Sequence, residues 1–313
     1  MNRQQLKDVR TVLAPMAGYT DGAFRLLCSE YGCDLTVTEM VSSKALVMGN
    51  TNTLRLLKVF QGSAPTFVQI FGHEPEVMAD SIQLDELAHF DGIDVNMGCP
   101  VRKIVSNGEG SALLEDISLA GKIVSALRKA TDKPLTIKYR VGVDKPDKVC
   151  DFTRMCRDNG ADGVTVHLRT RKQMYSGTAD YTLLEGVMNC AGNMSVFANG
   201  DIVDVASCNK ALSYGVQGVS VGRGALGRPC VFSEITNKPY SWEMADIYRT
   251  IARQWELTTQ YTPERVAVNE IKKHVAFYLK GIRHAKNTVV KVSQAKSASE
   301  IFAALDEFFK EYL

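Results

Sequence analysis

Eight short apolar runs recur at a regular spacing over residues 12–221, and their number constrains the fold more than any other feature of the chain. The runs are rich in β-branched residues and lie at 12–16, 35–40, 67–71, 93–97, 135–139, 164–168, 196–198 and 216–221. They are too uniformly apolar for strands with one face in water, and this is typical of parallel strands that are covered on both faces. Amphipathic stretches between them predict helices, for example at 21–31, 74–88, 117–130, 148–159 and 204–214. Eight β-α units predict a closed (β/α)8 TIM barrel, and a doubly wound open sheet is the alternative.

Each predicted strand ends in polar residues, glycine or proline. In chain order these are Pro15, Met16, Ala17 and Gly18; Glu39; Gln69; Asn96 and Cys99; Lys138 and Arg140; His167 and Arg169; Asn199, Gly200 and Asp201; and Gly222, Arg223 and Gly224. Any one of them could be a helix cap or a solvated loop residue. Together they would share the carboxyl rim of one barrel, where such barrels build their active sites. Lys138 and Arg140 face the same way on one strand, and a charge in a barrel mouth is costly without an anion beside it.

Cys99 is the first reactive side chain after the run at 93–97. Pro100 has no backbone N–H and biases Cys99 toward extended geometry, so we expect a loop here. A buried structural cysteine is the alternative interpretation. The eight cysteines are scattered without a C-x-x-C pair, which favours a reduced cytoplasmic protein over a disulfide framework or a zinc site.

The stretch from Gly222 to Gly227 matches the pattern G-x-G-x-x-G, which is also the fingerprint of dinucleotide-binding folds. That fingerprint normally opens the first β-α unit, whereas this copy ends the eighth. In a barrel, glycine turns after the last two strands usually hold a phosphate. The turns Asn199-Gly200-Asp201 and Gly222-Arg223-Gly224 are therefore predicted to bind a phosphate monoester, with Arg223 beside it.

The regular spacing stops after Pro229, and residues 236–241 read as a linker. We expect a barrel over residues 1–235 and a small all-α domain over 241–313, with helices at 243–261, 263–280 and 299–312 and a basic stretch at 281–296. Residues 264–297 carry eight Lys and Arg against two Glu. This excess of positive charge is either a solvated helix face or a site for a nucleic-acid backbone. No apolar run reaches the roughly 20 residues of a membrane span, and the N-terminus lacks a signal-peptide core.

Four motifs make the chain resemble the tRNA-dihydrouridine synthase family, in particular its bacterial B-type branch. They are Ala14-Pro15-Met16-Ala17-Gly18-Tyr19-Thr20-Asp21, Asn96-Met97-Gly98-Cys99-Pro100, His167-Leu168-Arg169-Thr170-Arg171 and Asn199-Gly200-Asp201-Ile202. The resemblance implies an FMN-binding barrel followed by a helical domain that grips tRNA, in a cytoplasmic monomer that uses NADPH and no metal. It implies that FMN is held without a covalent bond by Pro15, Met16, Ala17, Gln69, Lys138, His167, Asn199, Gly200, Asp201, Gly222 and Arg223. It also implies that Cys99 donates a proton, with Asn96 and Arg140 near the uracil of the substrate.

The implied reaction fits the side chains. Reducing the C5=C6 bond of uracil requires a hydride at C6 and a proton at C5, and a thiol near its ordinary pKa of about 8.5 is protonated at neutral pH. The target nucleotide must be flipped out of folded tRNA to reach a flavin in the barrel. Two alternatives are an enzyme like dihydroorotate dehydrogenase, which acts on the same bond of a small free pyrimidine, and a non-catalytic RNA-binding module.

Overall fold

Eight parallel strands form a closed barrel in the computed structural model, which describes residues 1–236, 238 and 240–312. The strands are β1 (Thr11–Leu13), β2 (Leu35–Val37), β4 (Thr66–Phe71), β5 (Gly92–Met97), β6 (Leu135–Arg140), β7 (Gly163–His167), β8 (Ser195–Asn199) and β9 (Gly218–Val221). They follow one another in sequence order, and β1 closes the barrel by pairing with both β2 and β9. The short strand β3 (Val41–Ser42) pairs with the far end of β4. The predicted TIM barrel is confirmed, and the open sheet is excluded by the pairing of β1 with β9.

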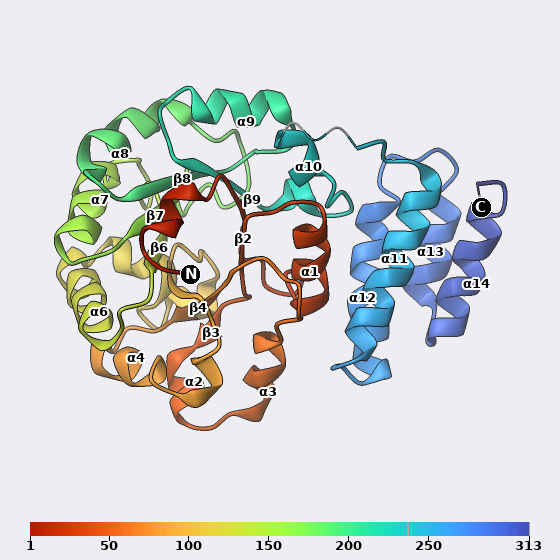
Figure 1. The fold of residues 1–313 in the computed structure, drawn as a ribbon, viewed down its shortest axis with the longest axis horizontal. Coiled ribbons are helices and arrows are strands. Elements are labelled where there is room, and N and C mark those ends of the chain that lie inside the picture. The colour runs from red at the N-terminus through yellow and green to blue at the C-terminus, as the bar shows by residue number, and fades with distance from the viewer. Residues whose placement is uncertain (237, 239, 313) are drawn as a thin grey trace.

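Helices surround the barrel as an outer ring (Figure 1). The α-helices of this part are α1 (Gly22–Glu30), α2 (Ser43–Val47), α3 (Thr51–Leu54), α4 (Pro75–Ser81), α5 (Arg102–Val105), α6 (Ile117–Ala130), α7 (Val149–Asp158), α8 (Leu184–Ala191), α9 (Val205–Leu212) and α10 (Val231–Ile235). Single 3-10 turns are η1 (Gln5–Asp8), η2 (Arg55–Leu57), η3 (Asp85–Leu87), η4 (Gly110–Leu114), η5 (Tyr181–Leu183) and η6 (Arg223–Ala225).

The helix predictions hold where an acidic cap and an apolar stripe coincide. Asp21 accepts a hydrogen bond from the N–H of Phe24 at the start of α1, and Asp116 does the same for α6. The helix predicted over 74–88 is too long, because α4 ends at Ser81, whose hydroxyl donates back to the carbonyl of Met78. Such a local bond competes with continued helix, and only the turn η3 follows.

The interior of the barrel is polar along one set of strand positions. Asp94 pairs in register with Thr136, and Asn96 pairs with Lys138, one step nearer the carboxyl rim. Side chains two residues apart on a strand point to the same face, so β5 and β6 together present four polar side chains on one side. The intervening residues, such as Val95 and Ile137, are fully buried in the main apolar core. This alternation brings the predicted site residues together at one end of the barrel.

Four helices form a compact bundle beside the barrel (Figure 1): α11 (Met244–Thr259), α12 (Glu264–Tyr278), α13 (Lys286–Gln294) and α14 (Ala298–Phe309). They enclose a second apolar core of their own. The three predicted helices are confirmed, and the basic stretch at 281–296, for which no helix was predicted, contains α13. Part of the predicted linker, at residues 237 and 239, lies outside the described residues.

The bundle packs tightly against the barrel. Leu257 of α11 shares a small apolar cluster with Leu26 and Leu27 of α1. Gly227, just after η6, has φ +72°, and a Cβ atom there would clash with the backbone carbonyl group of Phe277 in α12. The last glycine of the G-x-G-x-x-G stretch is therefore required for the contact between the two parts.

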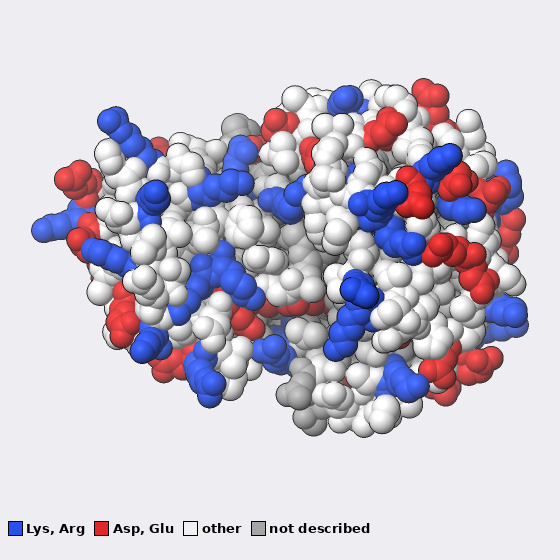
Figure 2. Space-filling model, turned by 180° about the vertical axis from the view of Figure 1, so that it is seen from behind, with Lys and Arg blue, Asp and Glu red and all other residues white. Residues whose placement is uncertain are grey.

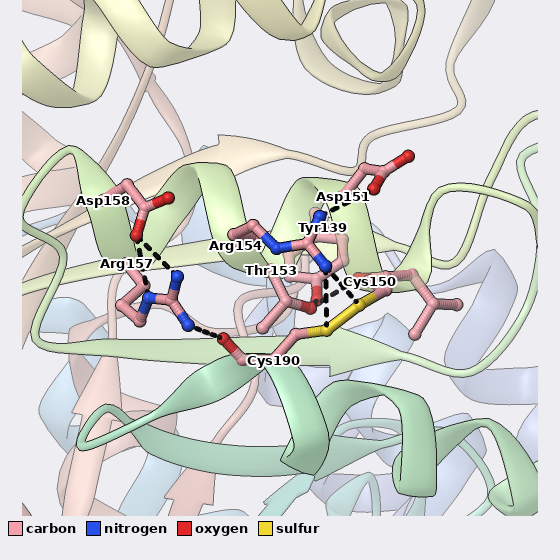
Figure 3. Close-up of a disulfide and its surroundings, with 9 residues drawn as sticks. Tyr139, Cys150, Asp151, Thr153, Arg154, Arg157, Asp158 and Cys190 are labelled. Carbon is pink, nitrogen blue, oxygen red and sulfur yellow. Dashed lines mark hydrogen bonds and ion pairs between the residues drawn. A yellow bond between two sulfur atoms is a disulfide. The ribbon is translucent and has the colours of Figure 1, made fainter.

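A disulfide joins Cys150 in the first turn of α7 to Cys190 in the last turn of α8. The expectation that the cysteines are reduced is wrong for this pair, because the packing of α7 on α8 brings together two residues that lie 40 apart in sequence. Figure 3 shows the guanidinium of Arg154 pointing at both sulfur atoms, at 3.3 and 3.9 Å. The other six cysteines are free, and of these only Cys99 is not buried.

Membrane spans and metal clusters are both absent from the part of the chain that the structure describes. None of the described helices is both long and apolar enough to cross a membrane. Within the same residues, no group of three or more His, Cys, Asp or Glu side chains gathers where it could hold a metal ion.

Candidate functional site

Cys99 lies on the rim in a loop that is held by backbone hydrogen bonds. Its N–H donates to Oδ1 of Asn96 at 2.9 Å, and its carbonyl accepts from the N–H and the hydroxyl of Ser111 at 3.1 and 2.8 Å. Burial raises the pKa of the Cys99 thiol above its ordinary value, although the positive charges of Arg140 and Lys138 oppose this shift. The thiol is therefore protonated at neutral pH and can act as a proton donor.

A chain of hydrogen bonds runs from inside the barrel to the cysteine loop. Asp94, only 2% exposed, accepts from Nε2 of Gln69 and from the hydroxyl of Thr136, both at 2.6 Å. Oε1 of Gln69 accepts from Nδ2 of Asn96 at 2.9 Å, which turns Oδ1 of Asn96 toward the N–H of Cys99. A carboxylate can only accept, so Asp94 sets the orientation of both amides. Burial raises the pKa of Asp94 to about 6, which leaves it ionised at neutral pH.

Lys138 is the cation at the centre of the mouth. Its Nζ donates to Oδ1 of Asn199 at 3.1 Å, and Asn199 in turn donates to the carbonyl of Ser220 at 2.7 Å. Burial and the neighbouring charge of Arg140 lower the pKa of Lys138 to about 8. The lysine keeps most of its charge at neutral pH and has two further N–H donors for an anionic edge of a ligand.

Arg140 ties the cysteine loop to the loop after β7. Its Nε donates to the carbonyl of Gly98 at 3.0 Å, and its Nη1 donates to the carbonyls of Thr170 and Met174 at 3.0 and 2.8 Å. Its guanidinium also lies 5.6 Å from the ring centroid of Tyr175. Burial lowers the pKa of Arg140 to about 10, so it remains charged at neutral pH.

The turn after β8 has a backbone that favours glycine at Gly200, with φ +122°. A Cβ atom there would lie 2.9 Å from Cβ of Ala179 and 3.2 Å from Cδ2 of His167. Burial lowers the pKa of His167, and the surrounding Lys and Arg side chains add to the effect. The imidazole is therefore neutral and packs against the turn as an uncharged donor or acceptor.

Arg169 is the residue of this site that the sequence places on the rim without a role. It is 2% exposed and donates through Nη2 to Oδ2 of Asp201 at 2.6 Å and to the carbonyl of Gly177 at 2.7 Å. Arg223 approaches Oδ1 of the same carboxylate at 3.5 Å. Hydrogen bonds from Arg169 and Ala179 outweigh burial and lower the pKa of Asp201. Only the spacing His167-x-Arg169 pointed to Arg169 in the sequence, because its partner is 32 residues away.

The loop between β1 and α1 lies beside the last glycine turn. Met16 donates its N–H to the hydroxyl of Thr20 at 2.9 Å, which forms a tight turn. A Cβ atom at Gly222 would lie 3.6 Å from Sδ of Met16, so the two segments are neighbours. Pro15 is half-exposed and Ala17 exposed on this same loop. Residues 15–17 therefore lie on the carboxyl side of the barrel, next to the turn after β9.

The donor set fits a phosphorylated flavin. Nη1 of Arg169 is buried and has no hydrogen-bond partner among the described residues, which is expected where an anion completes the set. The guanidinium of Arg223 and the glycine turn at Gly200 lie on the same side of the barrel. Such a group of backbone N–H and guanidinium donors suits a phosphate, and Lys138 suits an electron-rich ring edge.

Comparisons with known proteins agree with this arrangement. A family model described as Dihydrouridine synthase (Dus) matches residues 12–312. The tRNA-dihydrouridine synthase B of Escherichia coli strain K12 is 34% identical over an alignment of 324 residues, which covers 100% of this chain and 99% of that protein. The tRNA-dihydrouridine synthase B of Pseudomonas aeruginosa is 32% identical over 311 residues, with 96% and 93% covered.

A further relative and a solved structure extend the comparison. A probable tRNA-dihydrouridine synthase of Rickettsia conorii is 35% identical over 280 residues, with 87% of this chain and 84% of that protein covered. The crystal structure of mandelate oxidase superposes with a TM-score of 0.50 at 17% identity and covers 73% of each chain, which shows a shared barrel fold. The match of the family model over nearly the whole length, together with these full-length relatives, shows that the chain belongs to the dihydrouridine synthase family.

Proposed function

We propose that this protein is a tRNA-dihydrouridine synthase, which reduces the C5=C6 bond of uridines in the D-loop of tRNA to 5,6-dihydrouridine with FMN and NADPH. The observation that carries the proposal is the placement of Cys99. It is the one free thiol of the described chain that is not buried, and it lies on the barrel rim next to Arg140 and Lys138. The names of the full-length relatives support the same reaction.

FMN would be held without a covalent bond by the loop Pro15-Met16-Ala17, by Gln69, Lys138 and His167, and by the two turns at 199–201 and 222–223. When bound, FMN supplies the hydride that C6 of uracil requires. Arg223 and the unpartnered Nη1 of Arg169 would neutralise its phosphate, and Lys138 would bind the electron-rich edge of its ring. NADPH is the proposed reductant.

Cys99 would give its thiol proton to C5 from the face of the uracil opposite the flavin. Asn96 accepts a hydrogen bond from the backbone N–H of Cys99, and Arg140 donates one to the carbonyl of Gly98. Both bonds therefore fix the position of the thiol. Nη2 of Arg140 makes no hydrogen bond to the described part of the chain and is free to donate to a uracil carbonyl. Asn96 would contribute mainly by positioning, since Oδ1 already accepts two backbone N–H groups.

The helical domain would bind the tRNA backbone. Figure 2 shows a hollow between the two parts of the molecule, with Lys and Arg side chains on both of its flanks. Phosphates neutralised by such side chains release counterions and contribute affinity that depends on salt. A monomer in the cytoplasm, where the tRNA substrate resides, completes the proposal.

The test compares Cys99→Ala with Cys208→Ala, which removes a buried thiol on α9 away from the rim. Both variants should bind FMN and accept hydride from NADPH. Only Cys99→Ala should reduce tRNA more slowly, by about 10²–10⁴-fold, because it lacks the general acid. A wild-type protein that takes up no FMN, or a Cys99→Ala variant with the full rate, would overturn the proposal. Turnover of dihydroorotate instead of tRNA would reassign the substrate.

A further inference from the structure

The loop between β1 and α1 is held on two sides by charged side chains from elsewhere in the chain. Oε2 of Glu39, which follows β2, accepts from the N–H of Gly18 at 2.5 Å. Nζ of Lys273 donates to the carbonyl of Gly18 at 2.8 Å, although Lys273 lies 255 residues further along, on α12. Gly18 follows Pro15, Met16 and Ala17 directly, so a residue of the helical domain anchors the loop that is assigned to the flavin.

Other contacts of α12 with the loop show that the bond of Lys273 is part of a packed junction. Nζ of Lys273 lies 5.5 Å from the ring centroid of Tyr19. The same ring packs edge-on against His274 and Phe277, with centroid distances of 5.8 and 5.5 Å. Tyr19 thus lies between the loop and one face of α12, which restricts the motion of Lys273 as well as that of the loop.

Lys273, together with Arg25 and Arg55, also faces a group of partly or fully buried carboxyls at this junction. Burial raises the pKa values of Asp21, Glu39 and Glu270, and the charge of Lys273 acts against that shift in all three. A lysine in such surroundings has less freedom to leave for a nucleic-acid phosphate than an exposed lysine has, because its departure would remove a positive charge that acts on all three carboxyls, whereas Arg25 and Arg55 each act on only some of them. The neighbouring Lys272, by contrast, makes no hydrogen bond or ion pair with the described residues.

We propose that Lys273 is a positioning residue of the flavin site, and that the helical domain therefore contributes to cofactor binding as well as to tRNA binding. The inference rests on the proposed function, since that function assigns residues 15–17 to FMN. Removal of the bond frees the carbonyl of Gly18 and loosens the loop. Linkage between two ligands is reciprocal. A ligand that strengthens the contact between α12 and the loop therefore raises the affinity for FMN, and bound FMN raises the affinity for that ligand by the same factor.

The experiment uses the full-length chain with Lys273→Met, and with Lys272→Met as the matched control. Hydrogen exchange of residues 16–20 is measured in flavin-free protein, and the FMN dissociation constant is measured by fluorescence titration. Lys273→Met should speed exchange in this loop and raise the dissociation constant about tenfold, the size expected for one hydrogen bond to a charged group. Lys272→Met should change neither quantity.

A third variant, Lys273→Arg, keeps a charged donor and should stay close to the wild type in both measurements, which covers the case in which Lys273→Met fails to fold. Equal exchange and equal FMN affinity in the Met variants at the two positions would overturn the inference, as would an arginine variant that behaves like Lys273→Met. If the wild type binds no flavin, the proposed function fails, whereas the exchange measurement still decides whether Lys273 holds the loop.

Discussion

Two substitutions of Asp94 separate its role as an acceptor from its role as a charge. Asp94→Leu removes both acceptors and strands the Nε2 of Gln69 and the hydroxyl of Thr136 inside the barrel. Asp94→Asn removes only the charge, because its carbonyl oxygen can still accept from Gln69 while the hydroxyl of Thr136 rotates to accept from its amino group. The asparagine variant therefore keeps the amide orientations that lead to Cys99.

The size of the effect follows from the two stranded donors. A buried donor without a partner costs roughly 1–3 kcal/mol, so Asp94→Leu should be roughly 2–6 kcal/mol less stable than Asp94→Asn in urea unfolding at neutral pH. Both variants lack the buried charge, so its desolvation cost cancels from this comparison. The free energy difference therefore reports the loss of the hydrogen bonds without the contribution of the charge.

Alkylation of native protein by iodoacetamide reports on the cysteine loop. Cys99 is the one free cysteine of the described chain that is not buried, so reagent uptake measures this site, and Cys99→Ala supplies the blank. Asp94→Leu should be alkylated faster than Asp94→Asn, because Asn96 loses its orientation and releases the N–H of Cys99. Equal stability and equal alkylation of the two Asp94 variants would refute the role assigned to the carboxylate.

Three further predictions concern the disulfide, pH and salt. Reducing Cys150–Cys190 should lower the free energy of unfolding by roughly 4 kcal/mol, from the loop-entropy scale for 40 residues, and the double serine variant should be insensitive to reductant. Burial raises the pKa of Asp94 from 3.8 to about 6. The contribution of this group to stability is therefore fully present below pH 3.8 and is lost as the pH rises through 6. Relative to Asp94→Asn, the free energy of unfolding of the wild type in urea should fall by on the order of 3 kcal/mol between pH 3.5 and 7. Charge reversal at Lys280, Arg283 and Lys286 should make the log–log salt dependence of tRNA binding shallower, by about 0.7–0.9 for each phosphate that is no longer neutralised, and an unchanged slope would return these residues to a solvated face.

The barrel could be predicted from sequence because its signal is local and repeated. Each strand is an apolar run of a few residues, and eight similar runs leave few other architectures. The rim residues follow from the same pattern, since the ends of parallel strands meet at one edge. Helix α6 matches its predicted range over 117–130 because its cap and its apolar stripe lie within one segment.

The features that the sequence did not predict depend on pairs of distant residues. The role of Arg169 depends on its ion pair with Asp201, and the disulfide of Cys150 depends on Cys190. The hydrogen bond of Lys273 depends on Gly18, which lies near the other end of the chain. Asp94 sits inside an apolar run, where nothing local distinguishes a buried carboxylate with two donors from a strand residue facing solvent. Helix α13 was missed because only Thr288 and Val292 of its 9 residues are buried, which is too few to give a clear apolar stripe.

Closure of the barrel has a consequence for synthesis on the ribosome. Arg10, just before β1, donates to the carbonyl of Gln217, just before β9, across 207 residues of chain. At about 5–20 residues per second, β1 waits roughly 10–40 s for the strand that completes its pairing. Throughout that interval one edge of β1 is open to pairing with another nascent chain on the same message. The length of β1, only three residues, keeps this open edge short and limits such pairing.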